Sequence, residues 1–185
     1  MSKFAPILDA KLNYLFSRVG GSAIKLGLET TQNLMRHMGV DVLQLPCIHV
    51  AGTNGKGSVS AMIESVLREA GLRSGLYTSP HLIRFGERIR ISGDPIPDED
   101  LLRLLDAVEA ADQAQAAETG GRLGTFFELT TTVALKWFLE QQIQMAVLET
   151  GMGGRLDSTN VVIPLLSVLT DIGLEHAAFL GRTLP

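Results

Sequence analysis

The 185-residue sequence lacks several features that define whole classes of protein. It has a single cysteine, Cys47, which excludes an intrachain disulfide and makes the cytoplasm the expected location. No apolar run is long enough to cross a bilayer, because the longest candidate, residues 161–169, is interrupted by Pro164. We therefore expect a cytoplasmic protein without a membrane partner, in which Cys47 is a small core residue.

Charge is also sparse. Charged residues make up 19% of the chain and the net charge is −4, so the sequence has no basic excess for a general nucleic-acid surface. Hydrophobic residues make up 45%, which is typical of a folded domain with a sizeable core. These features favour small-molecule partners, bound where positive charge is placed locally.

Short apolar runs alternate with amphipathic stretches of helical length. We expect strands at 46–50, 74–78, 88–91, 145–148 and 165–170, and helices at 7–18, 30–38, 58–70, 97–117 and 130–141. Residues 1–45 form a short helical lead-in. This order predicts an α/β domain with a mainly parallel sheet flanked by helices.

Polar segments follow four of the expected strands, at residues 52–58, 79–81, 149–157 and 171–176. Ligands of parallel α/β sheets bind beyond the carboxyl ends of the strands. We therefore expect these four loops to converge on one edge of the sheet.

The first of these loops reads Gly-Thr-Asn-Gly-Lys-Gly-Ser and lies between a strand and a helix. Its backbone N–H groups, the helix dipole and Lys56 together predict a phosphate cradle and the use of a nucleoside triphosphate. The strict P-loop pattern fails twice, at Val50 and at Gly57. The alternative is a tight turn whose glycines only permit packing, but the position between strand and helix favours phosphate binding.

Glu149 ends an apolar run and precedes a second glycine-rich segment, Gly-Met-Gly-Gly. A carboxylate at the end of a strand suits Mg²⁺, although a glutamate exposed to water is the simpler interpretation. Taken alone, Ser79 is typical of a turn and His176 of a structural hydrogen bond. The first loop on the same edge favours the metal interpretation for Glu149.

Other charged residues leave alternatives open. Arg155 and Asp157 could pair with each other or bind an anionic ligand, and Glu64 is expected on a helix surface. A group of three arginines forms either a local positive cluster or a solvated strand face: Arg84, Arg88 and Arg90.

Five segments, in this order, resemble the folylpolyglutamate synthase/dihydrofolate synthase family of the Mur ligase superfamily. They are residues 51–58, 77–82 with 85–88, 125–128, 148–157 with 159–160, and 172–176 with 180–181. The phosphate loop is shared across the superfamily, whereas Ser-Pro-His-Leu and Gly-Gly-Arg-Leu-Asp belong to the folate branch.

The resemblance implies the P-loop-type central ATPase domain of a Mur ligase, with ATP and Mg²⁺ as cofactors. ATP would be bound by the phosphate loop, that is by Gly52, Thr53, Asn54, Gly55, Lys56, Gly57 and Ser58. Ser79, Glu149 and His176 would be the metal ligands, and Lys56, Glu149 and His176 the catalytic residues. The pteroate pocket would be lined by Ala23, Ile24, Lys25, Leu26, Pro80, His81, Thr125, Phe126, Phe127, Glu128, Leu156, Asp157 and Ser158.

The implied reaction is ATP-dependent addition of L-glutamate to dihydropteroate, to a tetrahydrofolate or to both, through an acyl phosphate. Family members are more than twice as long as this chain and carry a C-terminal domain that helps to bind glutamate. The family's carbamylated lysine would lie just beyond Pro185, and Glu175 replaces the usual aspartate. We therefore expect residues 1–185 to form the N-terminal ATP-binding domain of a monomeric ligase, inactive alone.

The sequence leaves two alternative functions. A cell-wall Mur ligase acting on a UDP-muramoyl peptide is disfavoured by residues 79–81 and 125–128. A non-catalytic module that binds nucleotide or pteroate would bind without releasing ADP. A doubly wound domain whose glycine-rich turns have no function is rejected, because the five ordered segments that resemble the family would then have to match by accident.

Overall fold

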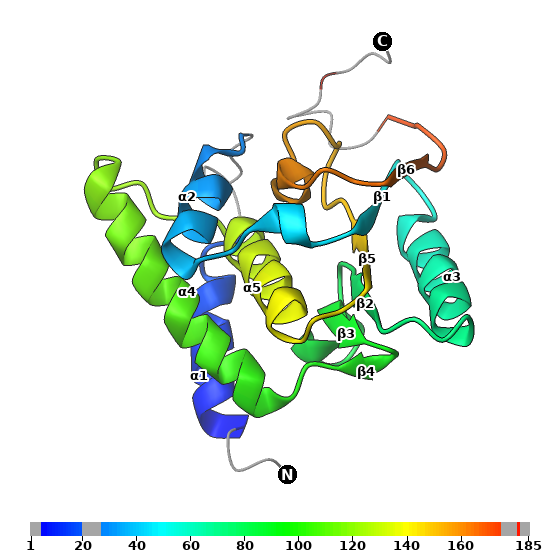
Figure 1. Cartoon of the computed structure of the whole chain (residues 1–185). Coiled ribbons are helices and arrows are strands. Elements are labelled where there is room, and N and C mark those ends of the chain that lie inside the picture. Colours follow the sequence, from blue (N-terminus) through cyan, green and yellow to red (C-terminus); the bar gives the residue numbers. More distant parts are fainter. Residues whose placement is uncertain (1–4, 20–26, 175–180, 182–185) are drawn as a thin grey trace.

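A six-stranded sheet runs through the middle of the structure (Figure 1), a computed structural model that describes residues 5–19, 27–174 and 181. Its strands lie in the order β4-β3-β2-β5-β1-β6. Strands β2, β5, β1 and β6 are parallel, and β3 and β4 extend the sheet as an antiparallel edge. The strands are β1 (Cys47–Ala51), β2 (Ser74–Tyr77), β3 (Ile89–Ile91), β4 (Asp94–Pro95), β5 (Met145–Glu149) and β6 (Leu166–Leu169). The predicted mainly parallel α/β sheet is confirmed.

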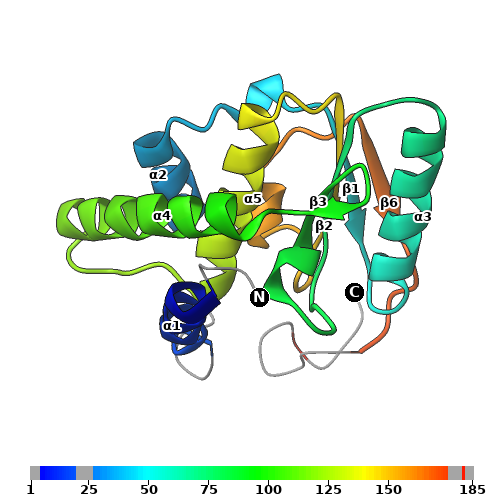
Figure 2. The same cartoon turned by 90° about the horizontal axis from the view of Figure 1, so that it is seen from below.

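Helices cover both faces of this sheet. They are α1 (Ala5–Phe16), α2 (Glu29–Met38), α3 (Lys56–Glu69), α4 (Asp98–Glu118) and α5 (Phe126–Glu140), with 3-10 turns at Val42–Gln44, Phe85–Arg88 and Ser158–Val161. Figures 1 and 2 show α3 alone on one face and the other four helices on the opposite side. Within the described residues, no helix is long and apolar enough to cross a membrane.

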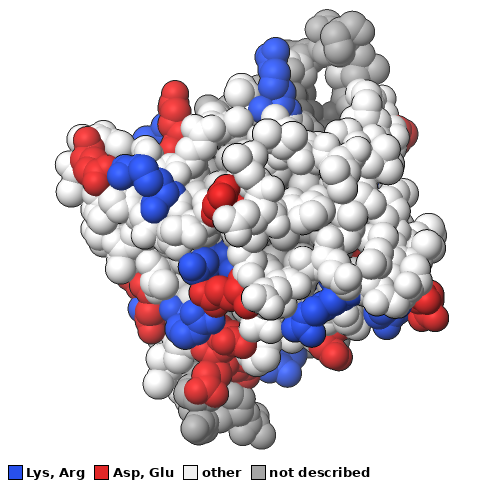
Figure 3. Space-filling view, viewed as in Figure 1, with Lys and Arg blue, Asp and Glu red and all other residues white. Residues whose placement is uncertain are grey.

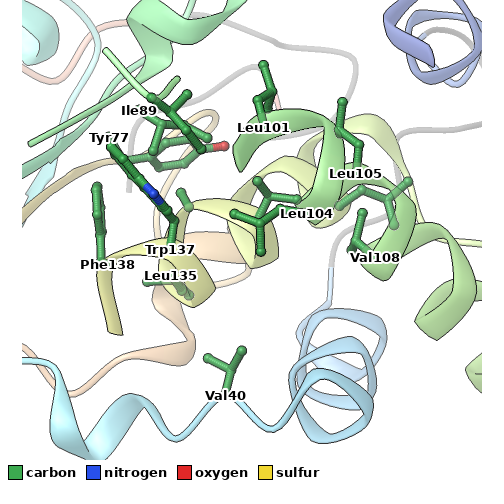
Figure 4. Close-up of a cluster of buried hydrophobic side chains, with 14 of the residues drawn as sticks. Val40, Tyr77, Ile89, Leu101, Leu104, Leu105, Val108, Leu135, Trp137 and Phe138 are labelled. Atoms are coloured by element: carbon green, nitrogen blue, oxygen red, sulfur yellow. The ribbon is translucent and has the colours of Figure 1, made fainter. Parts of the chain in front are cut away.

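Each face of the sheet has its own apolar core. Val50, Leu76 and Val147 pack under α3. The larger cluster lies on the other face, where Tyr77 and Ile89 of the sheet meet leucines of α4 and α5 (Figure 4). Because successive side chains of a strand point to opposite faces, two buried faces require apolar residues at every position, as in residues 145–148.

Four of the five helices begin earlier than the sequence pattern predicts, α3 and α5 among them. Helix α3 begins at Lys56. Helix α5 begins at Phe126, four residues before the predicted start, because Thr125 caps it. The Thr125 hydroxyl accepts from the N–H of Glu128, at 3.3 Å, and the Glu128 carboxylate accepts from the N–H of Thr125, at 2.7 Å. Thr-Phe-Phe-Glu is thus a capping box, a signal that the helical period alone does not reveal.

The expected surface position of Glu64 is wrong. Its side chain lies in the layer between α3 and β2, where it is only 5% exposed. One carboxylate oxygen accepts a hydrogen bond from the Ser74 hydroxyl at 2.7 Å, which compensates for part of its burial.

Charged side chains of opposite sign lie next to each other on the face in Figure 3, mostly toward its left and lower margins. Ion pairs between helices in this structure include Arg36 with Glu118 and Arg103 with Glu140. This face therefore carries no extended surface of one sign.

Candidate nucleotide and substrate site

The four polar loops converge at the carboxyl ends of β1, β2, β5 and β6, as predicted. The N–H of Ser79, after β2, donates to Glu149 at the end of β5, at 2.9 Å. The N–H of Asn54, after β1, donates to Asp171 after β6, at 2.7 Å. A Cβ added to Gly57 would lie 3.5 Å from a Glu149 carboxylate oxygen, so the start of α3 also faces this edge.

The segment from Gly52 to Ser58 connects β1 to α3 and includes the first turn of that helix. Gly52 has φ 132°, and a Cβ there would lie 1.9 Å from the Thr170 hydroxyl oxygen, so a side chain is excluded. Gly55 caps the helix with φ 79°, in the left-handed region that favours glycine. The Lys56 ammonium donates to the carbonyl oxygens of Gly52, at 2.7 Å, and Thr53, at 3.0 Å. Lysine and helix dipole together make this edge attractive to a phosphate.

Asp171 has a role that the sequence reasoning missed. Its carboxylate accepts from both the backbone N–H and the side-chain amide of Asn54, and its carbonyl oxygen accepts from the N–H of Thr53, at 2.8 Å. Hydrogen bonding to Asn54 lowers the pKa of Asp171. The Asp171 carboxylate therefore accepts hydrogen bonds from N–H groups of the loop that is predicted to bind phosphate. Only its position after the last strand hinted at this contact.

Glu149 is buried, with 4% of its surface exposed, although it ends a strand. Burial raises its pKa, while the hydrogen bond from Ser79 and the charges of Lys56 and Arg88 lower it. This result rejects the interpretation of a glutamate exposed to water. A buried carboxylate with a neighbouring serine at this edge provides the hard oxygen ligands that Mg²⁺ prefers, so these two residues fit such an ion.

The third predicted metal ligand, His176, lies outside the described residues, as does the Glu175 that precedes it. Among the residues that are described, no group of three or more His, Cys, Asp or Glu side chains could hold a metal ion. A magnesium site here would use Ser79, Glu149, water and phosphate oxygens.

The expected arginine cluster separates into different environments. Arg88 is buried, and its Nε donates to Nδ1 of His81 at 2.8 Å. Its guanidinium also lies over the rings of Phe85 and Phe126, at 5.7 and 5.2 Å from their centroids. In contrast, Arg84 is exposed and pairs with Asp98. The interpretation of a solvated strand face is therefore wrong for Arg88.

His81, a predicted substrate residue, belongs to an aromatic cluster beside Arg88. Its ring lies 5.9 Å from that of Phe85 and 6.1 Å from that of Phe16 in α1. Phe126 stacks on Phe16 at 5.1 Å. Burial lowers the pKa of His81, and the charge of Arg88 lowers it further, against an opposing effect of Glu87. Pro80, by contrast, is exposed.

The predicted pteroate residues of α5 divide into two kinds. Thr125 and Glu128 form the capping box, and Glu128 is only 1% exposed. Phe127 is half-buried and lies against the glycine loop after β5, since a Cβ added to Gly151 would come within 2.6 Å of its ring.

The remaining pteroate residues lie in the loop after β5 or outside the described residues. Leu156 is 41% exposed, whereas Ser158 is buried. The four residues of the first predicted segment lie outside the described residues: Ala23, Ile24, Lys25 and Leu26.

Asp157 organises the loop after β5 and is not paired with Arg155. It is 5% exposed and accepts from the N–H groups of Gly151 at 3.0 Å, Met152 at 2.9 Å and Thr159 at 2.9 Å, and from the Thr159 hydroxyl. The alternative of an Arg155–Asp157 pair is therefore wrong. Each hydrogen bond from a backbone N–H to the Asp157 carboxylate restrains the position of the loop at that residue.

Cys47 is fully buried, as expected of a core residue. Burial raises the pKa of its thiol to about 11, so it is not a nucleophile at neutral pH.

Known proteins are similar to this chain in sequence and in fold. No protein-family model matches the chain. It is 44% identical over 166 residues to the dihydrofolate synthase/folylpolyglutamate synthase of Bacillus subtilis, across 87% of this chain and 37% of that protein. A solved structure described as the FPGS-AMPPCP complex has a TM-score of 0.86 and 39% identity, across 95% of this chain and 42% of the other. Escherichia coli FolC in complex with DHPP and ADP has a TM-score of 0.84 and 37% identity, across 95% of this chain and 41% of the other.

The chain thus spans between 37% and 42% of the length of these relatives. Within that span, sequence and fold agree over nearly all of the chain, in the mixed, mostly parallel sheet of a Mur ligase-type fold. The chain belongs to the folylpolyglutamate synthase/dihydrofolate synthase family.

Proposed function

We propose that this chain is the ATP-binding part of a ligase that joins L-glutamate to a pteroate or folate substrate. One observation carries the proposal: Lys56 and the start of α3 face the same sheet edge as the buried Glu149. A site that transfers a phosphoryl group must place cationic and metal-binding groups around one polyanion. The relatives with AMPPCP or with DHPP and ADP support the same assignment.

The phosphate loop would bind the triphosphate. The N-terminal N–H groups of α3 and the Lys56 ammonium supply positive charge, and Lys56 would exchange its contacts with Gly52 and Thr53 for phosphate oxygens. Ser79 and Glu149, with His176, would hold Mg²⁺, which neutralises phosphate charge when bound.

The substrate would lie beside the triphosphate. His81 and Phe127, with the loop residues Leu156, Asp157 and Ser158, would position the pteroate group so that its carboxylate oxygen attacks the γ-phosphorus. ADP leaves from that phosphorus and an acyl phosphate results. The glutamate amine then attacks the acyl carbon, inorganic phosphate leaves and the amide forms. Holding the reactants in line is the main contribution that these residues can make.

We further propose that residues 1–185 are the N-terminal domain of a longer, monomeric, cytoplasmic enzyme whose remaining part completes the glutamate site. The share of the relatives that the chain spans, between 37% and 42%, supports this arrangement. On this proposal the chain binds nucleotide but does not turn over by itself.

The first test is calorimetric binding of AMPPCP with Mg²⁺ to this chain, beside Lys56→Ala and the control Lys136→Ala. Lys136 is paired with Glu140 on α5, far from the loop in sequence. Loss of a charge-assisted contact predicts binding weaker by about 10–100-fold for Lys56→Ala and no change for the control.

The second test is Mg-ATP-dependent ADP release by the longer natural protein with dihydropteroate and L-glutamate. Release that is lost in Lys56→Ala would establish the ligase. Nucleotide binding without release, with dihydropteroate and with tetrahydrofolate substrates alike, would instead identify a binding module.

A further inference from the structure

His49 is a buried histidine with no part in the reaction as described so far. It lies in β1, three residues before the phosphate loop, and is 6% exposed. Its backbone is paired with Leu148 of β5, next to Glu149. Burial lowers the pKa of its imidazole, and the charge of Asp157 opposes that shift.

The imidazole is hydrogen-bonded to a residue 110 positions away. Its Nε2 lies 2.7 Å from the hydroxyl oxygen of Thr159. That hydroxyl also donates to a carboxylate oxygen of Asp157. Because the single hydroxyl proton is used there, the oxygen of Thr159 must accept from His49, which places a proton on Nε2.

The chain of bonds continues into the loop after β5. The other carboxylate oxygen of Asp157 accepts from the backbone N–H groups of Gly151 and Met152. These amides follow Glu149 by two and three residues, and Gly151 lies against the ring of Phe127. One path of hydrogen bonds therefore joins the strand before the phosphate loop to the loop that begins at Glu149.

We propose that His49 is a positioning residue: through the Thr159 hydroxyl it orients the carboxylate of Asp157 and so holds the loop of residues 150–158 in the geometry that the pteroate group requires. This proposal rests on the proposed function for its substrate. Its structural part, the control of the Gly151 and Met152 amides by His49, does not depend on that function.

The structural part is tested by amide hydrogen exchange in this chain, resolved residue by residue by NMR. In His49→Leu, which keeps an apolar side chain but loses the donor, the loss of about one net hydrogen bond predicts exchange of the Gly151 and Met152 amides faster by about fivefold. Cys47→Ala is the matched control, because Cys47 is also buried in β1 and its side chain forms none of the hydrogen bonds of the path. It should leave the two amides unchanged.

The conservative variants separate hydrogen bonding from packing. In His49→Gln the amide nitrogen of the side chain can replace Nε2 as the donor, and in Thr159→Ser the hydroxyl is retained. In both variants the Gly151 and Met152 amides should exchange as slowly as in the parent chain, whereas in Thr159→Val they should exchange as fast as in His49→Leu. If His49→Leu does not fold, the comparison of Thr159→Val with Thr159→Ser tests the proposal. Unchanged exchange in His49→Leu or in Thr159→Val would overturn the proposal.

Binding to dihydropteroate and to AMPPCP then tests the connection to the site. We expect His49→Leu and Thr159→Val each to weaken dihydropteroate binding by about fivefold to tenfold, and the double variant to be no weaker, since both break one path. AMPPCP affinity should change by less than about twofold. An equal loss of both ligands would overturn the positioning role. If the unaltered chain binds AMPPCP but no pteroate ligand, the proposed function fails, while the exchange result still stands.

Discussion

The carboxylate of Glu149 accepts a hydrogen bond from the backbone N–H of Ser79 at 2.9 Å, and this bond joins the carboxyl ends of two neighbouring parallel strands. The same carboxylate lies next to Gly57 at the start of α3. Three loops that are far apart in the sequence therefore meet at one buried acid, and the consequences of that position can be measured.

Replacing that acid with Glu149→Gln should stabilise the chain and impair its site. Burial raises the pKa of Glu149 in the folded state, so its charge opposes folding at any pH above that value. At pH 7 the variant should unfold at a higher temperature, and a rise of about 2–4 °C would correspond to about 1 kcal/mol at this chain length.

The same variant should lose the strengthening of AMPPCP binding by Mg²⁺. Thermal unfolding with and without Mg²⁺ and AMPPCP measures both effects. A variant that is less stable than the parent and still responds to Mg²⁺ would contradict the assignment.

Asp171→Asn should bind nucleotide more tightly. The Asp171 carboxylate is hydrogen-bonded to Asn54, so its negative charge lies against the loop proposed to bind a polyanion. Removing the charge should raise AMPPCP affinity several-fold at low ionic strength, and the difference should shrink as salt screens it. Calorimetry at two salt concentrations measures this. Weaker binding by the variant would instead show that Asp171 supports the bound state.

Arg18→Met should destabilise the chain strongly. Arg18 forms an ion pair with Asp112, whose side chain is fully buried and also accepts from the N–H of Gly124 at 2.7 Å. Without the arginine, a buried carboxylate has no counter-charge, which typically costs about 3–5 kcal/mol of unfolding free energy.

The matched control is Lys11→Ala, since Lys11 lies on α1, close to Arg18 in the sequence, but forms partly exposed ion pairs with Asp106 and Glu109. Such pairs contribute at most about 1 kcal/mol. Urea denaturation compares the two variants, and equal losses would show that the burial of Asp112 is not decisive.

Acidification should weaken the fold through two histidines, the buried His49 and the partly buried His81. Burial lowers the folded-state pKa of both His49 and His81 below the ordinary value of 6.5. As the pH falls below 6.5, these histidines are therefore protonated in the unfolded chain before they are protonated in the folded chain. The unfolding free energy decreases over this pH range, until the pH reaches the folded-state pKa values. In His49→Gln, whose side chain does not titrate, the decline should be shallower. Urea denaturation between pH 7.5 and about 5.5 tests the sign; a decline identical in parent and variant would exclude His49 as a contributor.

The local elements of this protein and the chemistry of its phosphate loop could be predicted from the order of its residues. Strands and helices are indicated by hydrophobic patterns within short stretches of sequence, such as the apolar runs at 145–148 and 165–170 and the amphipathic stretches between strands. Because these patterns are local, the type and order of the elements could be predicted. The phosphate loop was predictable for the same reason, because its glycines, lysine and following helix are contiguous. The convergence of four loops followed from the general geometry of parallel sheets.

Which polar side chains are buried, and which partners they bond to, depends on contacts between residues that are far apart in the sequence. Arg88 and Glu64 are charged, and nothing in their sequence neighbours shows that helices and strands enclose them. Asp157 is satisfied largely by donors within its own loop, but the loop closes on β1 through a contact between Thr159 and His49, 110 residues apart. Contacts of that separation depend on the packing of the whole sheet, which a local pattern of residues does not encode.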